Sequence, residues 1–585
     1  MELAKHRIDT MPKRKLWATG AAVATILLLQ RGVMAQDAQP AQIPVGAQQF
    51  AAAADPAPGA APATVVPVAQ GQVSQETINF LVDQRLQQIE DAKKQAEDQK
   101  KAEAAQQGYV VGSDLSVKTS YKDGNFLWFE TPNKDFTMHI GAWMQWDNVW
   151  WDQSPGTKAA RGGATAHPAG VASGPNTGGI GELEDGEYFR RIRPFAEGAF
   201  WDVGEYRLIL ALENDQFSTA GLDEFWVGEK DIPFLGTARV GHVKTPMGLE
   251  GDMTASSRCM TFMERSSYSE AIELNQNFTT GMWFSNNYLD QHVTSTFAMT
   301  RPDLKTSSGA YFGDGQYALQ GRLTFLPLYE DEGRHLLHLG LSAGWRNGQA
   351  NVNSSVYSGN TIQLSARPEL RDDAPAGGGN GVVTNANSNK MVDTGVIASG
   401  QEYILGTEML YIRGPFSVQA EYGWNWIDQA QGVVLNTSST TTAFAGFGAP
   451  ADYVFSGGYV QFAYSLTGEN RAYDRRFGTL AREYFGKSGP YANAWVTRDE
   501  NGNVCASWGA WEIAARLSYV DLNDGSGATR IRGGDMDGVT LGLNWYANNN
   551  LNVNFDYVYD YRYNLPTGVN AGSVNGLGVR VQFQF

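Results

Sequence analysis

Arginine and lysine side chains gather in two parts of a chain that is acidic overall, with a net charge of −17 at pH 7. In the first part, Arg190, Arg191 and Arg193 lie almost next to one another. The second group consists of Arg471, Arg475, Arg476, Arg482, Lys487 and Arg498. Guanidinium and ammonium groups bind anions because their N–H donors replace part of the anion's hydration shell. These groups favour anion selection in a pore over the alternative, ion pairs with nearby acids such as Glu469 and Asp474.

The residue types that catalysis or metal binding requires do not form a set. The seven histidines are scattered, and His335 and His338 would face opposite sides of a strand. One acidic run could hold Ca²⁺ at a loop, but a solvated loop is the favoured interpretation; it consists of Glu182, Glu184, Asp185 and Glu187. We therefore expect no enzyme, no cofactor and no metal site. The strong negative charge also argues against nucleic acid as a partner.

The C-terminal residues alternate strictly between apolar and polar types. The apolar set is Leu577, Val579, Val581, Phe583 and Phe585, and the residues between them are Gly578, Arg580, Gln582 and Gln584. A period of two places these sets on opposite faces of a strand. An apolar face that continues to a terminal aromatic residue is typical of outer-membrane barrels, where it meets lipid and the other face meets an aqueous lumen.

The first 107 residues predict export, followed by a linker and a helix. A basic start, an apolar run over residues 16–29 and a small residue at Ala35 indicate a signal peptide, residues 1–35. Residues 36–73 are rich in Ala and Pro and predict an extended linker. Residues 74–107 lack Pro and Gly and carry a partial heptad pattern. Both a self-associating helix, most simply a trimer, and a solvated single helix fit this segment.

From residue 136 onward the alternating pattern recurs in segments of roughly 9–15 residues, the length of a tilted strand that crosses a bilayer. A soluble sandwich would have shorter strands. No segment after the signal has the roughly 20 continuous apolar residues of a membrane helix. Residues 108–135 are a lead-in, and residues 136–585 predict an all-β, 16-stranded antiparallel transmembrane barrel. Its strands are expected near residues 136–151, 187–201, 204–214, 222–230, 237–245, 278–288, 291–300, 317–328, 334–347, 402–414, 415–428, 453–466, 508–521, 537–547, 550–563 and 574–585.

The connections alternate in length, as a barrel with both ends in the periplasm requires. Tight turns are expected at residues 202–203, 289–290 and 414–415, whereas residues 152–186, 246–277 and 348–401 are long and belong outside. The connection 467–507 is long although parity assigns it to the periplasmic side. In the strand near residue 190, Arg191 and Arg193 share one face, which must be the lumen because arginine facing lipid costs about 2–4 kcal/mol. Arg190 is then expected near an interface.

Several motifs resemble the phosphate-selective porin O and P family. The most specific is Val240-Gly-His-Val-Lys-Thr-Pro-Met-Gly-Leu-Glu250, followed by Thr261-Phe-Met-Glu-Arg-Ser266. Further similar segments are residues 458–469, Trp508-Gly-Ala-Trp-Glu512 and residues 517–522. The resemblance covers roughly residues 126–585.

This resemblance implies a sixteen-stranded barrel, usually a trimer, and a loop after Gly-Leu-Glu that bends into the lumen. It also implies that residues 467–507 fold inward from the periplasmic side. Basic side chains on these inserts and on the wall would bind the anion; by position the insert candidates are Arg258, Arg265, Arg471, Arg475, Arg476 and Lys487. If both inserts enter the lumen, a disulfide between Cys259 and Cys505 is conceivable, with two isolated cysteines as the favoured alternative.

Two functional hypotheses follow. The first is a passive outer-membrane pore, through which small hydrophilic solutes pass down their gradient without chemistry, with small anions such as phosphate favoured. It would sit in lipid as a homotrimer in the outer membrane of a Gram-negative-type bacterium. The second is a structural tether, in which residues 74–107 reach the cell wall and the barrel is an anchor. Deleting residues 36–107 separates them, because a pore keeps its conductance and a tether loses envelope attachment.

Overall fold

The computed structural model describes most of the chain after residue 109. The described ranges are 110–122, 125–160, 177–212, 221–253, 257–273, 278–301, 317–347, 350–353, 356–359, 361–371, 389–398, 401–435, 443–481, 484–485, 489–498 and 502–585. The predicted signal peptide, linker and helix at 74–107 lie outside these ranges and stay predictions, as does the tether hypothesis that depends on them. Among the described residues, no helix is long and apolar enough to cross a membrane.

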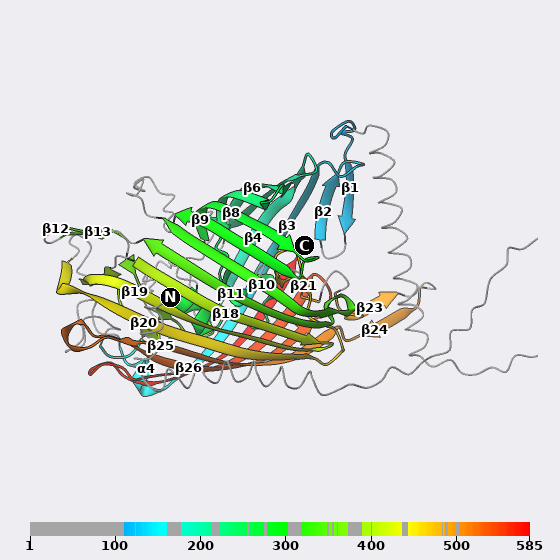
Figure 1. The fold of residues 1–585 in the computed structure, drawn as a ribbon. Coiled ribbons are helices and arrows are strands. Elements are labelled where there is room, and N and C mark those ends of the chain that lie inside the picture. The colour runs from blue at the N-terminus through cyan, green and yellow to red at the C-terminus, as the bar shows by residue number, and fades with distance from the viewer. Residues whose placement is uncertain are drawn as a thin grey trace, which may run out of the picture. The chain divides into compact units, whose positions relative to one another are not determined.

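Sixteen antiparallel strands form a closed barrel, which confirms the predicted architecture (Figure 1). Each strand pairs with the next along the chain, and the last strand, β28, pairs with the first, β3. The strands are β3 (Thr137–Gln153), β4 (Gly186–Phe200), β5 (Gly204–Ala211), β6 (Gly221–Ile232), β7 (Gly236–Lys244), β8 (Phe278–Tyr288), β9 (Val293–Arg301), β10 (Ala318–Glu330), β11 (His335–Asn347), β18 (Gln401–Arg413), β19 (Phe416–Leu435), β20 (Ala443–Ser465), β25 (Ala510–Asp524), β26 (Ile531–Tyr546), β27 (Leu551–Tyr563) and β28 (Gly572–Gln584).

The two faces of the wall have opposite character, as the alternation predicts. On β28, Leu577 and Phe583 point outward and are 48% and 40% exposed, whereas Arg580 and Gln582 point inward and are each 2% exposed. Apolar side chains are therefore exposed and polar ones buried, the reverse of a soluble protein. This inversion follows from an apolar solvent outside and a polar lumen inside.

Two β-strands precede the barrel in the segment expected to be a simple lead-in. β1 (Lys118–Lys122) and β2 (Asn125–Glu130) pair with each other, and β2 continues onto the start of β3. The pairing joins Leu127–Glu130 of β2 to Thr137–Ile140 of β3. The ring of Trp128 stacks on that of His139 with centroids 4.6 Å apart. The hairpin thus extends the sheet beyond the point where β28 ends.

Two strands are longer than their apolar alternation predicts. β19 continues to Leu435 rather than residue 428, and β20 begins at Ala443 rather than residue 453. Their extra residues still pair, for example Val433 with Ala445, but only after register shifts beyond Ile427. A bulge changes which face a side chain takes, so the period-two signal is lost although the backbone pairing continues.

Three segments between the strands enter the lumen, and we call them the first insert (residues 246–277), the second insert (467–507) and the third insert (361–398). Inward bending of the first two agrees with the expectation. Placing all of 348–401 outside was wrong, because residue Glu369 of the third insert bonds the inward-facing Arg516. The elements of the inserts are η2 (Gly248–Met253), η3 (Ser257–Cys259), η4 (Ser269–Glu273), β14 (Thr361–Ile362), β15 (Ser365–Ala366), β16 (Val392–Asp393), β17 (Ile397–Ala398), β21 (Tyr473–Asp474), β22 (Thr479–Leu480), β23 (Trp495–Arg498) and β24 (Val504–Ser507).

An apolar cluster packs the third insert against the first insert and the barrel wall. Leu364 and Met391 of the third insert contribute to it, together with Ile272 of η4 and the wall residues Tyr453 and Phe455, and all five are at most 1% exposed. Burial of this apolar area stabilises the plugged arrangement by roughly 25 cal/mol per Å² removed from water. Outside the lumen, the shorter elements are α4 (Pro155–Lys158), η6 (Asp331–Gly333), β12 (Ala350–Asn353), β13 (Val356–Gly359) and η7 (Gly527–Thr529).

Candidate functional site

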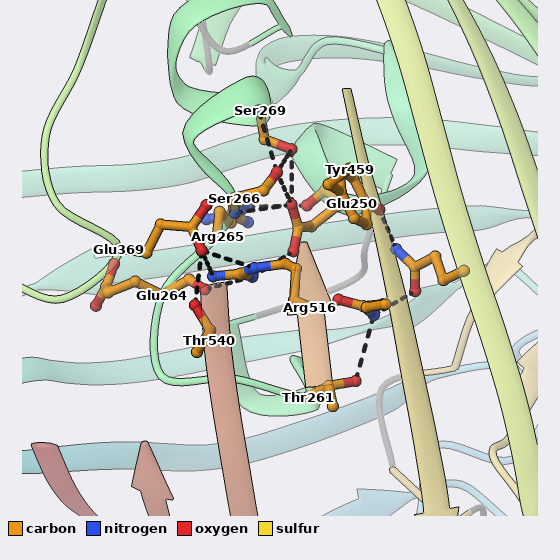
Figure 2. A network of polar contacts seen from close by, with 12 residues as sticks. Glu250, Thr261, Glu264, Arg265, Ser266, Ser269, Glu369, Tyr459, Arg516 and Thr540 are labelled. Carbon is orange, nitrogen blue, oxygen red and sulfur yellow. Dashed lines mark hydrogen bonds and ion pairs between the residues drawn. The ribbon is translucent and has the colours of Figure 1, made fainter. Parts of the chain in front are cut away.

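Arg516 of β25 joins two inserts to the barrel wall (Figure 2). Its side chain is fully buried, and its Nε and Nη2 donate to Glu369 Oε2 at 2.9 and 2.7 Å. Its Nη1 donates to Glu250 Oε1 at 3.2 Å. Glu369 belongs to the third insert and Glu250 to η2 of the first. One guanidinium therefore bonds two buried carboxylates and fixes both inserts to the same strand.

The other carboxylate oxygen of Glu250 caps the start of the next helical turn. Glu250 Oε2 accepts hydrogen bonds from Ser266 N at 2.9 Å and from Ser269 Oγ at 2.8 Å (Figure 2). Thr540 of β26 adds a third donor to Glu369, with Oγ1 2.7 Å from Oε2. The buried oxygens of this network thus have partners, which is the condition for a buried polar network to hold one conformation.

A β-bulge in β4 turns both Arg190 and Arg191 toward the lumen. Gln145 of β3 pairs with Arg191 and Trp146 pairs with Phe189, so Arg190 is the extra residue. Arg190 donates to both carboxylate oxygens of Glu264, from Nε at 2.8 Å and from Nη2 at 3.1 Å. The expectation that Arg190 sits near an interface was wrong, because a bulge places two neighbouring side chains on one side of the sheet.

Glu264 is the centre of a cluster of guanidinium groups at the first insert. Besides Arg190, Arg580 Nη2 lies 2.9 Å from Glu264 Oε1, and Arg191 and Arg371 each approach a Glu264 oxygen to 3.9 Å. Burial alone would raise the pKa of Glu264, but the charges of Arg190, Arg191 and Arg580 hold it well below its usual range. Glu264 is therefore ionised throughout the physiological pH range.

This arginine cluster carries more positive than negative charge. Arg580 also pairs with Asp147, with Nη2 2.7 Å from Oδ2, and Arg371 pairs with Glu270, with Nη2 3.0 Å from Oε2. Arg367 adds a second guanidinium to Glu270 at 2.8 Å. The members are Arg190, Arg191, Arg367, Arg371 and Arg580 with Asp147, Glu264 and Glu270, so five cations face three anions. An anion in the lumen would find an excess of positive charge here.

The wall from β4 to β7 carries a row of ion pairs in which the arginines are partly exposed. Arg193 Nη1 lies 2.7 Å from Asp223 Oδ2, and the side chains are 18% and 9% exposed. Arg207 bridges Glu197 and Glu224, at 2.9 and 3.1 Å. The structure thus places both Arg191 and Arg193 on the lumen face, as their shared parity predicts. Neither points into lipid.

Residues 473–480 of the second insert lie against the inner wall from β5 to β11. Arg476 Nη2 donates to Glu205 Oε2 and to Thr237 Oγ1, each at 3.1 Å. Further along the same stretch of wall, Arg322 of β10 donates to the backbone oxygen of Gly478 at 2.8 Å, and Tyr473 OH lies 2.7 Å from His338 Nδ1 of β11. These contacts hold residues 473–480 on one side of the lumen.

Arg471 and Arg475 of the second insert have different surroundings. Arg471 is 6% exposed, and its guanidinium donates to Thr261 Oγ1 at 2.7 Å and to the backbone oxygen of Cys259. It joins the second insert to the first. Arg475 lies near the mouth, where its guanidinium contacts Asp290 and stacks over Tyr329 at 4.5 Å. Of the two, only Arg475 is open to a passing solute, at 23% side-chain exposure.

The remaining basic residues predicted on the inserts, Arg258, Arg265 and Lys487, also differ in their surroundings. Arg258 lies over the rings of Trp143 and Phe195, at 5.1 and 5.5 Å from their centroids, where an arginine has a cation–π contact. Arg265 Nε donates to the backbone oxygens of Glu250 and Gly251, so it closes the first insert on itself. Lys487 lies outside the described residues. The side chain of Cys505 does too, so its pairing with the fully buried Cys259 stays a prediction.

Sequence reasoning did not name Glu264, Glu369, Arg516 or Arg580 as site residues. Alternation did place Arg580 on the polar face of its strand, and it gives the same position to Arg516, because each is a charged residue at an inward position of an alternating strand. Glu369 had no such signal, because residues 361–371 lack a period. In the described part of the chain, no group of three or more His, Cys, Asp or Glu residues is placed to hold a metal ion.

Comparisons with known proteins agree with this architecture. A family model described as phosphate-selective porin O and P matches residues 175–585. Porin O of Pseudomonas aeruginosa is 24% identical over 457 residues, which cover 76% of this chain and 86% of that protein. An uncharacterized protein of Caulobacter vibrioides is 26% identical over 366 residues, and the match spans 62% of this chain and 60% of that relative's length. Among solved structures, a loop deletion mutant of OmpT from Vibrio cholerae aligns with a TM-score of 0.40 at 9% identity, covering 77% of this chain and all of OmpT.

Proposed function

The chain belongs to the phosphate-selective porin O and P family, a family of outer-membrane channels, and we propose that it passes small hydrophilic solutes with a preference for anions such as phosphate. Solutes cross by diffusion, and selection comes from the charge and width of the plugged lumen. No bond is made or broken, so the protein acts as a channel rather than an enzyme.

The excess of positive charge around Glu264 carries this proposal. Arg191 contributes most directly, because within the described residues its short hydrogen bond goes to the neutral Gln145, at 2.7 Å, while its distance to Glu264 is 3.9 Å. Arg190 and Arg367 are the more exposed members of the cluster, with side-chain exposures of 18% and 30%, and the neighbouring Arg193 is 18% exposed. An anion can replace water at these guanidinium groups, whereas a cation is repelled.

The acidic composition of the chain does not oppose this preference. Most inward-facing carboxylates described above are already bonded to arginine, for example Glu205 to Arg239 at 2.8 Å and Glu408 to Arg322 at 2.6 Å. Such pairs contribute little net field at a distance. The arginine cluster therefore dominates the potential around Glu264.

Ion selectivity in a planar bilayer tests the proposal. The refolded full-length chain is placed across a KCl gradient, and phosphate is then added to both sides. We expect a reversal potential that reports anion preference and a block of chloride current at millimolar or lower phosphate. The variant R191Q should lose most of this preference, while R413Q, at an exposed site at the end of β18, serves as the matched control. Cation selectivity without phosphate block in the wild type would overturn the proposal.

We also propose that the channel is a homotrimer in the outer membrane, surrounded by lipid on its apolar face. A solved OmpT of Vibrio cholerae is described as a trimer form, and this is the assembly expected from the family resemblance. Light scattering on the detergent-solubilised protein, corrected for bound detergent, should give three copies of the chain. A single copy would contradict this part of the proposal.

A further inference from the structure

Two buried carboxylates on the other side of the first insert lie close together without arginine. Glu273 of η4 is 4% exposed and Glu421 of β19 is 3% exposed. Leu249 N donates to Glu421 Oε1 at 2.5 Å, and a side chain on the preceding residue, Gly248, would collide with the Glu273 carboxylate. Consecutive residues of η2 therefore contact the two acids, and we call this region the carboxylate pair.

The hydrogen-bond partners of the carboxylate pair are all neutral. Glu421 Oε2 accepts from Glu250 N at 2.8 Å and from Tyr459 OH at 2.5 Å. Glu273 Oε1 accepts from Tyr268 OH at 3.0 Å. These donors stabilise a carboxylate but add no positive charge. Within the described residues, neither acid has an ion pair with Arg, Lys or His.

The neighbouring charged groups cannot supply that charge, because each is already paired. Glu408 of β18 is paired with Arg322 at 2.6 Å and with His338 at 3.0 Å, and Glu250 is paired with Arg516. The titratable groups that face the carboxylate pair are Arg322 of β10, His338 and Arg346 of β11, Glu402 and Glu408 of β18, Glu250 of η2, Arg516 of β25, Tyr268 and Tyr459, and Arg346 is paired with Glu402. Among the residues that the structure describes, two carboxylates thus share a buried site without a cation, where uncompensated charge is strongly disfavoured. One shared positive charge would neutralise one of them and leave the other to the neutral donors named above.

A small cavity lies beside Glu273, one member of the pair. It has a volume of about 30 Å³, and its polar lining is Thr245, Glu273, Gln320, Arg346 and Glu402. Glu273 Oε2 faces it as a buried oxygen without a hydrogen-bond partner. Arg346 Nη2 is engaged with Glu402 Oε2 at 2.6 Å. The volume is enough for one or two particles the size of water.

We propose that Glu273 and Glu421 form a binding site for one monovalent cation, which enters through this cavity. Its occupant is a proton or an alkali metal ion, because both bring a single positive charge to carboxylate oxygens and fit the space. Burial raises the pKa of Glu273 well above its usual range, and the Glu421 carboxylate adds to this, so a proton is retained when no metal ion binds.

The bound cation would attach the first insert to the wall. Without it, repulsion between the two acids would push η2 and η4 away from β19 and loosen the constriction. This inference does not depend on the anion preference proposed above, since the carboxylate pair lies on the wall formed by β18 to β20 and the arginine cluster on β3, β4 and β28.

Thermal unfolding of the refolded full-length chain tests the site. Tryptophan fluorescence is followed at pH 6 and pH 9, at equal ionic strength, in choline chloride, NaCl or KCl. In choline chloride we expect the midpoint of the wild type to fall by at least about 2 °C between pH 6 and pH 9. A fall that Na⁺ or K⁺ reverses identifies an alkali ion as the occupant, and an equal fall in all three salts identifies a proton.

The variants E273Q and E421Q should show a smaller fall than the wild type and no response to the salt, because glutamine is neutral at both pH values and has nearly the same shape as glutamic acid. E182Q, at a carboxylate that is 65% exposed, is the matched control and should behave as the wild type. The proposal is overturned if the wild-type midpoint is unchanged under all conditions, a result that requires no variant to fold. It is also overturned if E273Q and E421Q respond as the wild type does.

Discussion

Glu264 and Glu273 lie on the same insert and are equally buried, at 4% exposure each, yet they have opposite surroundings. The pKa of Glu264 is held well below its usual range, and that of Glu273 is raised well above it. Burial acts on both in the same direction, so burial does not explain the difference. The opposite pKa shifts come from the arginines around Glu264 and the carboxylates around Glu273.

The difference shows that the barrel wall decides the charge state of the insert. Strands β4 and β28 bring Arg190, Arg191 and Arg580 to Glu264. Strands β18 and β19 bring Glu408 and Glu421 to Glu273. A single insert therefore separates a side rich in arginine from a side with buried carboxylates that have no arginine partner in the described parts of the chain. The same loop sequence on another wall would have different properties.

Arg516 marks the boundary between these two sides, and its removal should have the largest effect. R516A leaves Glu250 and Glu369 buried without a guanidinium partner. The region of buried carboxylates that have no arginine partner would then include these two residues as well as Glu273 and Glu421. We expect a loss of about 3–5 kcal/mol in the free energy of unfolding, as found when one partner of a buried pair is deleted. Urea unfolding in lipid vesicles measures it.

R413A, at an exposed position, is the control for R516A and should change the free energy of unfolding by less than about 0.5 kcal/mol. R516M tests whether the loss comes from the missing charge rather than from the missing side-chain volume, because methionine keeps the apolar bulk without the charge. R516M should be nearly as unstable as R516A. Equal stability of R516A and the wild type would mean that the two inserts are held mainly by their apolar packing.

The ion pairs of Glu270 with Arg367 and Arg371, which join the first insert to the third, should persist to low pH. Burial alone would raise the pKa of Glu270, but Arg371 and Arg367 lower it to about 2. A pKa depressed in the folded state gives stability that is present above the ordinary pKa of 4.5 and is lost as the pH falls toward 2. The wild type should exceed E270Q by about 2–3 kcal/mol at pH 7 and by almost nothing at pH 2.

The contrast between E270Q and the wild type is measured by urea unfolding at pH 7, 4, 3 and 2. E182Q again is the control, because the exposed Glu182 should give no such pH-dependent difference. A gap that stays constant from pH 7 to pH 2 would show that the effect of E270Q comes from shape rather than from charge.

Neutralising Glu264 should sharpen the anion preference of the arginine side. E264Q removes one negative charge from the cluster and keeps the side-chain size. A unit charge about 10 Å from a solute contributes about 1.7 kcal/mol at an effective dielectric constant of about 20. Its removal favours an anion and disfavours a cation, so the ratio of anion to cation permeability should rise by up to roughly two orders of magnitude. The rise should shrink in high salt because ions screen the charge. An unchanged ratio in E264Q at low salt would place the solute path away from this cluster.

Much of the barrel could be read from the sequence, because each strand repeats a simple rule. Alternation predicted the sixteen strands, the tight turn at Leu289 and Asp290, and the lumen position of Arg191 and Arg193. A lipid-facing strand has no other way to satisfy both solvents. The family resemblance added the inward bend of the first two inserts.

The partners within the lumen could not be read in this way. The contact of Glu369 with Arg516 joins residues 147 positions apart, across a loop without a period. The lumen position of Arg190 depends on a single bulge, which shifts the register without changing the composition. Insert contacts are set by the closed shape of the wall, and local sequence does not contain that shape.

Replacing Arg475 should have the smallest effect on the free energy of unfolding of the three substitutions R516A, E270Q and R475A. Its guanidinium lies 3.6 Å from the Asp290 carboxylate, but that carboxylate is 90% exposed. An ion pair with an exposed partner is screened by water and typically contributes about 0–1 kcal/mol. R475A should therefore change the free energy of unfolding by less than about 1 kcal/mol, whereas R471A, whose buried guanidinium joins two inserts, should cost clearly more. If urea unfolding gave equal losses for both variants, the exposure of the partner would not be what separates structural arginines from solute-facing ones in this lumen.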